Sequence, residues 1–213
     1  MTCSFDLSHY RELVEAARAG GYRFAFFDRQ PRPGDLLLRH DVDLALDAAL
    51  AMAELEAELE APATYFVMTR SEFYNLDSPS GEAALERLRR LGHQVGLHAV
   101  YPGAGRDARF DPVLSWHNPD PDYMTAPVEG FTNAMQPGFF DPDRYRSDSN
   151  QRWRNGCPHA ELARGGFDWL QLLVHPEIWV YPGETMRATM LAMLDRERDR
   201  RLDQLEADRI DLS

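Results

Sequence analysis

Short apolar segments alternate with helical patterns between residues 36 and 98, and this alternation restricts the possible folds more than any other feature. Strands are predicted at Leu36–His40, Ala63–Met68 and Gln94–His98. Between them, Leu44–Glu60 is rich in strong helix formers, and a second helix is expected from a cap at Ser80 to Gly92. A β-α-β-α-β order predicts parallel strands with helices outside the sheet. We therefore expect an α/β fold.

The rest of the chain adds a helix at each end and further strands. Ser8 is expected to cap a first helix that ends at Gly20, and a long polar helix rich in Met and Leu is expected at Thr185–Ala207. Further strands are predicted at Phe24–Phe27, Val113–Trp116 and Leu170–Val174. Asn118–Tyr145 has little periodicity, so we expect a long loop that covers a functional region.

The length and charge of the chain limit its organisation and its partners. Its 213 residues suit one domain, with an N-terminal helix at 8–20, a core at 22–181 and a C-terminal helix at 185–207. The net charge of −12 argues against a nucleic-acid partner. No apolar segment approaches the length of a membrane span, and the first residues lack the basic start and apolar core of a secretory signal. We therefore expect a cytoplasmic protein. Its two cysteines, Cys3 and Cys157, do not indicate a disulfide framework.

Two carboxylates follow the strongest strand candidate. The apolar run Leu36–Leu38 leads into Arg39-His40-Asp41-Val42-Asp43. Because side chains alternate along a strand, Asp41 and Asp43 are expected on the same side and His40 on the opposite side, in a packing or hydrogen-bonding role. Two close carboxylates repel each other unless a metal ion or a proton relieves the repulsion. The pair therefore indicates a chemical site at the carboxyl end of the strand.

Three histidines also stand at the ends of predicted strands. They are His98, His117 and His175. A parallel barrel would bring these ends together with Asp41 and Asp43, whereas the alternative is a set of separate, hydrogen-bonded or exposed rings. One carboxylate and two imidazoles suit Zn²⁺ and leave positions open for water and substrate. A second carboxylate would serve as general base and a further histidine as general acid, so the pattern favours metal-assisted hydrolysis.

Five motifs in order carry a family resemblance. They are Arg-His-Asp-Val-Asp, Ala-Thr-Tyr-Phe, Gly-His-Gln-Val-Gly-Leu-His, Ser-Trp-His-Asn-Pro and Leu-Gln-Leu-Leu-Val-His-Pro-Glu. Together they resemble the polysaccharide deacetylase superfamily (NodB homology, carbohydrate esterase 4), in a divergent branch with Asp-x-Asp and His-Asn-Pro motifs. The resemblance covers the chain from about Asp35 to Tyr181. The resemblance implies a distorted, incomplete (β/α) barrel with helices outside a mostly parallel sheet. It also implies a divalent metal, usually zinc, and removal of acetyl groups from N-acetylated sugars.

The resemblance assigns roles to particular residues. Asp41 resembles the catalytic base and Asp43 the metal-binding aspartate, although most members place these two acids side by side and here Val42 intervenes. His175 matches the late-strand histidine that acts as general acid toward the departing amine. The motif also implies a first histidine ligand at His98.

The chain departs from the family pattern at the second histidine ligand. The family places it four residues after the first, but that position here is Pro102. We expect His117 of the His-Asn-Pro motif to replace it, which gives Asp43, His98 and His117 as the predicted ligands. The helix that the family has between His98 and Val113 also has no counterpart in the sequence pattern.

Several polar and aromatic residues are further candidates for substrate contact. They are Arg39, Asn118, Asp148, Arg152 and Trp179. A plain turn explains the segment around Asp148 almost as well, and Trp179 would also suit the core. His93 is expected to have a structural role, and His9 and His159 are expected on the surface.

Three functions remain open from the sequence. The first is a metal-dependent deacetylase of an N-acetylated sugar or a sugar-linked precursor. The second is a hydrolase of another linear amide C–N bond. The third is an inactive sugar-binding or scaffold protein, an interpretation that Pro102 and the shortened barrel support.

Overall fold

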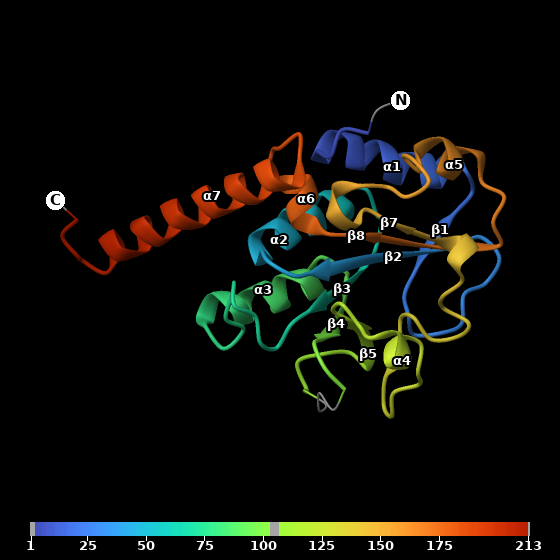
Figure 1. The fold of residues 1–213 in the computed structure, drawn as a ribbon, viewed down its shortest axis with the longest axis horizontal. Coiled ribbons are helices and arrows are strands. Elements are labelled where there is room, and N and C mark those ends of the chain that lie inside the picture. The colour runs from blue at the N-terminus through green and yellow to red at the C-terminus, as the bar shows by residue number, and fades with distance from the viewer. Residues whose placement is uncertain (1–2, 103–106, 213) are drawn as a thin grey trace.

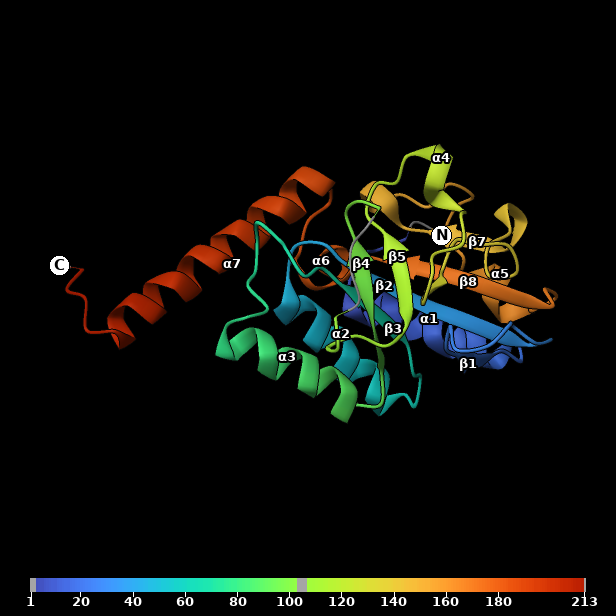
Figure 2. The ribbon, with the colours of Figure 1, turned by 90° about the horizontal axis from the view of Figure 1, so that it is seen from below.

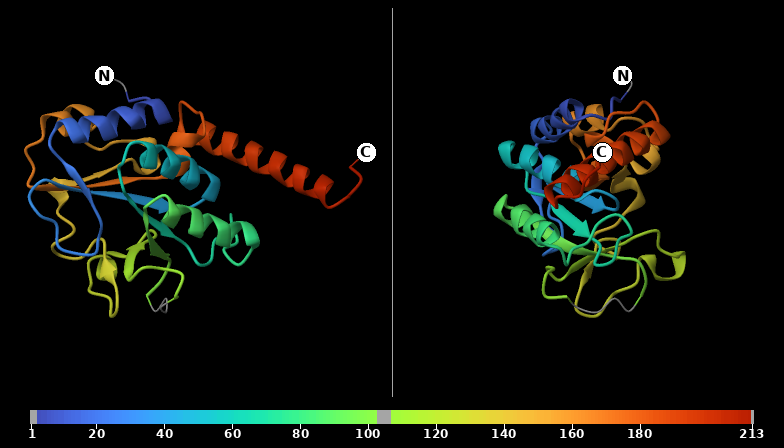
Figure 3. Two further views of the ribbon diagram at one scale, coloured as in Figure 1. Left: turned by 180° about the vertical axis from the view of Figure 1, so that it is seen from behind. Right: turned by 90° about the vertical axis from the view of Figure 1, so that its left-hand side faces the viewer.

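A computed structural model describes residues 3–102 and 107–212 of the chain. Its centre is an eight-stranded sheet with the order β6-β5-β4-β3-β2-β8-β7, and β1 pairs with the first residues of β2 (Figure 1). Every strand pair is parallel. The sheet is strongly curled, and its two end strands, β6 and β7, are not paired with each other within the described residues (Figure 3). The expected α/β class with a half-barrel sheet is therefore confirmed.

The elements have the following bounds. The strands are β1 (Arg23–Ala25), β2 (Asp35–Val42), β3 (Thr64–Val67), β4 (Gln94–Ala99), β5 (Val113–Trp116), β6 (Thr132–Asn133), β7 (Tyr145–Ser147) and β8 (Trp169–Val174). The α-helices are α1 (Leu7–Ala19), α2 (Leu46–Glu58), α3 (Pro79–Arg90), α4 (Pro121–Met124), α5 (His159–Arg164), α6 (Pro176–Val180) and α7 (Met186–Ala207). Two short 3₁₀ turns, η1 (Pro142–Arg144) and η2 (Ser149–Gln151), flank β7.

The helices cover the outside of the sheet. Figure 2 shows α1, α2 and α3 on one side of the strands and α4 with its neighbouring loops on the other. The main apolar core lies between these helices and alternate residues of the strands, among them Leu38, Val42, Tyr65 and Val174. His40 points into this layer, where Nε2 lies 2.6 Å from Glu56 of α2, as alternation along β2 predicted.

A second apolar cluster fills the inside of the curl at one end. Its members are Ala25, Phe27, Leu37, Phe66, Val113, Ala134 and Phe139. The buried amide of Gln171 donates to the backbone carbonyls of Ala134 and Phe139, at 2.9 and 2.7 Å. These bonds hold the segment after β6 against the inner face of β8, so this end of the curl is closed and the carboxyl ends of the strands remain accessible.

Helix α7 extends away from the rest of the chain (Figure 1). Thr185 caps it by accepting a hydrogen bond from the Ala188 backbone, and Thr189 and Met193 are buried near its start. Among the described residues, no helix combines the length and the apolar character that a bilayer crossing requires.

Some predicted boundaries were wrong. The first helix is capped by Asp6, whose carboxylate accepts from the His9 backbone at 2.8 Å, and not by Ser8. The cap of α3 is Ser78, not Ser80, because Pro79 occupies the first helical position. Among the described residues, the strands β6 and β7 and the helices α4, α5 and α6 were missed, since each is short and lacks a distinct period. The segment expected to be an irregular loop contains α4 and β6.

Candidate metal centre

The five residues predicted to bind metal or to act in catalysis line one pocket. Asp41, Asp43, His98, His117 and His175 surround a cavity of about 470 Å³ at the carboxyl ends of β2, β4, β5 and β8. Asp41 and His98 are the second-last residues of β2 and β4. Asp43, His117 and His175 each lie one residue beyond the end of a strand, which is β2, β5 and β8 respectively. Parallel pairing brings these ends together, as expected for a ligand site in this class of fold.

Three side chains converge on one point of this pocket. His98 Nε2 lies 2.9 Å from Asp43 Oδ1, and His117 Nδ1 lies 3.1 Å from the same oxygen. One ligand atom from each residue lies within 4.8 Å of the other two. We call Asp43, His98 and His117 the candidate metal centre. One carboxylate oxygen and two imidazole nitrogens form a donor set that suits Zn²⁺ and leaves coordination positions for solvent and substrate.

The ionisation of these groups is compatible with metal binding. Burial alone would raise the pKa of Asp43, but hydrogen bonds from His117 and His98 outweigh it and hold that pKa well below its usual range. The bond to Asp43 raises the pKa of His117. Asp43 is therefore a carboxylate at neutral pH, and a cation at this point would take the place of the hydrogen bonds that His98 and His117 make to it.

Ser115 orients His98 from the neighbouring strand. The two residues are paired in the register of β4 and β5, and Ser115 Oγ lies 3.1 Å from His98 Nδ1. The same hydroxyl donates to both oxygens of Asp41, at 3.1 and 3.2 Å. Such a contact selects the ring tautomer and directs the other nitrogen toward the metal position. The sequence interpretation missed Ser115, although its place two residues before His117 puts both on one face of β5.

Asp41 is held by a buried arginine. Arg39 Nε lies 2.8 Å from Asp41 Oδ1 and Arg39 Nη2 lies 2.7 Å from Oδ2, a bidentate pair on one face of β2. Both residues are at most 4% exposed. Burial would raise the pKa of Asp41, but the charge of Arg39 keeps it below its usual range. Asp41 Oδ2 lies 3.8 Å from His98 Nε2, beside the candidate metal centre rather than within it.

His175 faces the centre from β8. Its Nε2 lies 4.0 Å from Asp43 Oδ2, and its Nδ1 lies 2.6 Å from Oδ1 of Asp148. Asp148 also accepts from Trp179 Nε1 at 2.7 Å and from the His175 backbone. Burial would lower the pKa of His175, but Asp148 raises it to about 10. The imidazolium is therefore available as a proton donor at neutral pH.

A further buried acid, Glu177, follows His175 by two residues. Glu177 is 2% exposed, and its Oε2 has no hydrogen-bond partner among the described residues. Burial raises the pKa of this carboxyl to about 8. The sequence analysis assigned it no role, because nothing in the His-Pro-Glu motif reveals that the third residue of the motif is buried.

Aromatic and amide side chains form the pocket wall. Trp116, Tyr145 and Trp153 are among the residues that line it, and planar rings of this kind provide flat apolar surface for a ligand. Asn118 Nδ2 lies 3.1 Å from His117 Nε2. The backbone of Asn118 has φ 45°, a left-handed conformation that asparagine tolerates, and it turns the chain directly after His117.

Of the five predicted substrate contacts, two line the pocket and three do not. Asp148 and Trp179 are fully or almost fully buried and do not line the pocket; Asp148 bonds to His175, and Trp179 donates to Asp148. Arg152 is exposed and lines a different hollow, which also includes Cys3. Arg39 and Asn118 do line the pocket. His9, expected on the surface, is only 5% exposed.

The position at which the resemblance places a second histidine ligand lies outside the pocket wall. Pro102 is exposed and is not part of the pocket wall. His117 of the adjacent strand instead brings the second imidazole to Asp43. Residues 103–106, part of the segment expected to lack a helix, lie outside the described residues.

The chain was compared with models of protein families, with curated proteins and with solved structures, and nothing matches it.

Proposed function

We propose that this protein is a metal-dependent hydrolase that cleaves an amide C–N bond, with an N-acetylated sugar or sugar-linked precursor as substrate. The observation that carries the proposal is the convergence of Asp43, His98 and His117, whose ligand atoms lie within 4.8 Å of one another. Two further groups lie beside them: Asp41 Oδ2 is 3.8 Å from His98 Nε2, and His175 Nε2 is 4.0 Å from Asp43 Oδ2. A carboxylate on one side and an imidazolium on the other are what amide hydrolysis requires.

Asp43, His98 and His117 would hold the metal, most simply Zn²⁺. A zinc ion there supplies a water of lowered pKa and an electrophile that polarises the acyl oxygen. Asp41 accepts the proton of the attacking water, and Arg39 keeps this carboxylate ionised and fixed in orientation. Because the pKa of Asp41 is low, it is a weak base that depends on the acidity the metal confers.

His175 completes the reaction on the leaving-group side. Its Nε2 points into the pocket while Nδ1 contacts Asp148, so the proton at Nε2 is the one available to the departing nitrogen. An amine is a poor leaving group until it is protonated, and the high pKa of His175 ensures that the proton is present at neutral pH.

Two observations support a sugar derivative as substrate. The order of the five motifs resembles the polysaccharide deacetylases, whose substrates are N-acetylated sugars. The pocket has the volume of a small-ligand site and combines aromatic walls with amide and guanidinium groups, including Asn118, Asn155 and Arg154. Another acetamide of similar size would meet the same catalytic groups, so the two hydrolase hypotheses differ only in the assay substrate.

Zinc content and acetate release test the proposal together. We expect Asp43→Ala, His98→Ala and His117→Ala each to contain one zinc equivalent less than the wild type after dialysis against a zinc-buffered solution. His159→Ala is the matched control, because this histidine lies outside the pocket wall and should not alter the content. Acetate released from N-acetylated sugars, and not from N-acetylated peptides, would support the substrate class. Full zinc retention in His117→Ala would refute the ligand set, and zinc binding without acetate release would favour a sugar-binding protein.

A further inference from the structure

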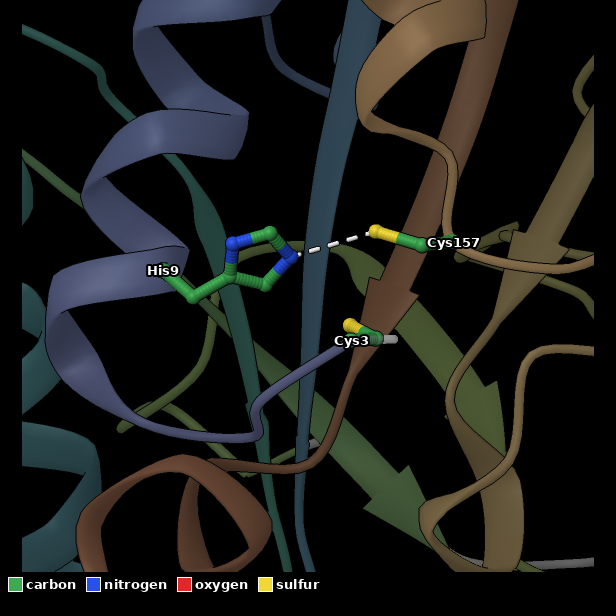
Figure 4. Close-up of side chains that lie close together, drawn as sticks. All are labelled: Cys3, His9 and Cys157. Atoms are coloured by element: carbon green, nitrogen blue, oxygen red, sulfur yellow. Dashed lines mark hydrogen bonds between the residues drawn. The ribbon is translucent and has the colours of Figure 1, made fainter. Parts of the chain in front are cut away.

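A second group of ligand-type side chains lies on the other side of Asp148 and Trp179. Cys3 of the N-terminal segment, His9 of α1 and Cys157 of the segment before α5 converge, although up to 154 positions separate them along the chain (Figure 4). His9 Nε2 lies 3.1 Å from Cys157 Sγ, and one ligand atom of each residue lies within 4.8 Å of the other two. We call these three residues the thiol cluster.

The imidazole of His9 is fixed in the orientation that a metal ligand requires. Its Nδ1 lies 2.8 Å from Glu12 Oε2, so Nε2 is the nitrogen that faces the sulfurs. A carboxylate on the far nitrogen of a histidine is the arrangement found behind many zinc ligands, since it sets the tautomer and strengthens the donor. The ring is also stacked on Trp179, with centroids 6.4 Å apart. His9 is thus oriented toward the cysteines by contacts that do not involve them.

The two cysteines are half-buried and are free thiols. Trp153 Nε1 donates to Cys3 Sγ at 3.2 Å, a bond to sulfur of the kind that supports a thiolate ligand. Burial and the neighbouring Cys157 raise the pKa of the Cys3 thiol to about 12. At neutral pH this sulfur carries a proton, which a soft metal ion must displace on binding.

We propose that Cys3, His9 and Cys157 bind a Zn²⁺ ion, with a solvent molecule in the fourth position. Two sulfurs and one imidazole form a soft donor set that selects zinc over magnesium or calcium. Ideal tetrahedral geometry with the usual bond lengths would place the ligand atoms about 3.5 to 3.8 Å apart. His9 Nε2 and Cys157 Sγ lie 3.1 Å apart, and all three ligand atoms lie within 4.8 Å of one another, so small side-chain rotations would reach this geometry. The thiol cluster shares no residue with the candidate metal centre, so each site can be tested independently of the other.

Metal at the thiol cluster would stabilise one wall of the pocket. It would join the N-terminal segment to the chain at Cys157, and the residues just before it, Trp153 to Gly156, line the pocket. An ion that binds the folded chain but not the unfolded one raises stability by mass action. The site would therefore have a structural role, with no part in the chemical step.

Cobalt substitution provides a test that reports on sulfur ligands alone. We expect Co²⁺, added to protein kept reduced with a phosphine, to give the near-ultraviolet charge-transfer absorption of thiolate-bound cobalt. The candidate metal centre contains no sulfur, so Asp43→Ala should retain the full absorption. Cys3→Ser and Cys157→Ser should each reduce it, and the double variant should abolish it. His9→Ala should weaken cobalt binding by tenfold or more, whereas His117→Ala, which removes a histidine outside the thiol cluster, should leave the charge-transfer absorption unchanged.

Thermal unfolding supplies a second readout. In the Asp43→Ala background, zinc should raise the melting temperature, and the Cys3→Ser/Cys157→Ser variant should lose this increase. Absence of the charge-transfer band in reduced wild-type protein, which needs no variant to fold, would overturn the proposal. So would recovery of a Cys3–Cys157 disulfide, with loss of two hydrogen atoms by mass, from protein prepared in excess zinc. Equal loss of the charge-transfer absorption in His117→Ala would overturn the ligand assignment.

Discussion

His175 Nδ1 lies 2.6 Å from Asp148 Oδ1, and through this contact a fully buried carboxylate orients a histidine of the pocket wall. Trp179 Nε1 and the backbone N–H of His175 donate to the same carboxylate. Asp148 thus has its donors arranged around it and has little freedom to move. The arrangement keeps Nε2 of His175 directed toward Asp43 and keeps the ring protonated.

We expect Asp148→Asn to lower the pKa of His175 from about 10 toward its ordinary value of about 6.5. The variant removes the negative charge that opposes the effect of burial, so the protonated ring loses its main stabilisation. A titration of the imidazole followed by NMR measures this directly and needs no substrate. If His175 is the general acid, the alkaline limb of the kcat/KM profile moves to lower pH with it, and kcat at neutral pH falls about 100-fold.

Trp179→Phe is the control for this effect. It removes one donor to Asp148 but leaves both the charge and the contact with His175. The pKa of His175 should then remain close to its wild-type value. An unchanged pKa in Asp148→Asn would show that Asp148 does not set the protonation of His175.

We expect Ser115→Ala to weaken zinc binding about 10- to 100-fold without removing a ligand. The Ser115 hydroxyl lies 3.1 Å from Nδ1 of His98, and without it the ring is free to rotate and to change tautomer. Competition with a chelating dye measures the affinity. Ser147→Ala is the matched control, because Ser147 also lines the pocket but its hydroxyl bonds to Ser149. Equal weakening by both variants would contradict an orienting role for Ser115.

Alternation along the strands accounts for the part of the site that the sequence could predict. In β2 it placed Asp41 on one face and His40 on the other, and the structure has both in these positions. The histidines at the ends of β4, β5 and β8 could be found because parallel pairing puts strand ends side by side. Local pattern was sufficient because each of these residues is positioned by its own strand.

Residues whose role depends on distant contacts could not be predicted in the same way. Asp148 was expected to contact substrate, yet its carboxylate is directed at His175 by β7, a strand of three residues with no recognisable period. Cys3 and Cys157 carried no motif, because the spacing that matters between them is spatial. Periodicity reports which face a side chain occupies, but it does not report which distant segment covers that face.

We expect Arg39→Met to destabilise the fold by about 3 to 5 kcal/mol, because it leaves the buried carboxylate of Asp41 without its partner. The pKa of Asp41 should rise in the variant, since Arg39 is what keeps it low. Urea unfolding in metal-free buffer measures the loss. The double variant Arg39→Met/Asp41→Asn should recover part of it, because no uncompensated charge remains. Additive losses in the double variant would show that the ion pair itself is not the source of the effect.

Glu56 provides the clearest pH-dependent contribution to stability away from the pocket. Its carboxylate is completely buried and accepts hydrogen bonds from Tyr10, from Tyr65 at 2.6 Å and from His40 at 2.6 Å. His40 Nδ1 has no partner among the described residues, so the ring contacts Glu56 through Nε2. Burial would raise the pKa of Glu56, but His40 and the hydrogen bonds lower it.

A carboxylate with a lowered folded-state pKa contributes stability above its unfolded-state pKa, about 4.3 for glutamate, and this contribution is lost as the pH falls through the folded-state value. We therefore expect Glu56→Gln to cost about 3 kcal/mol at pH 7, with a difference from wild type that shrinks toward about pH 3. Denaturant unfolding at several pH values measures it. Glu54→Gln on the same helix is the control, because Glu54 forms only an exposed pair with Arg87 at 3.2 Å and should change stability by less than about 1 kcal/mol. An equal loss of stability for Glu56→Gln at pH 7 and at about pH 3 would mean that the charge of Glu56 does not stabilise the core.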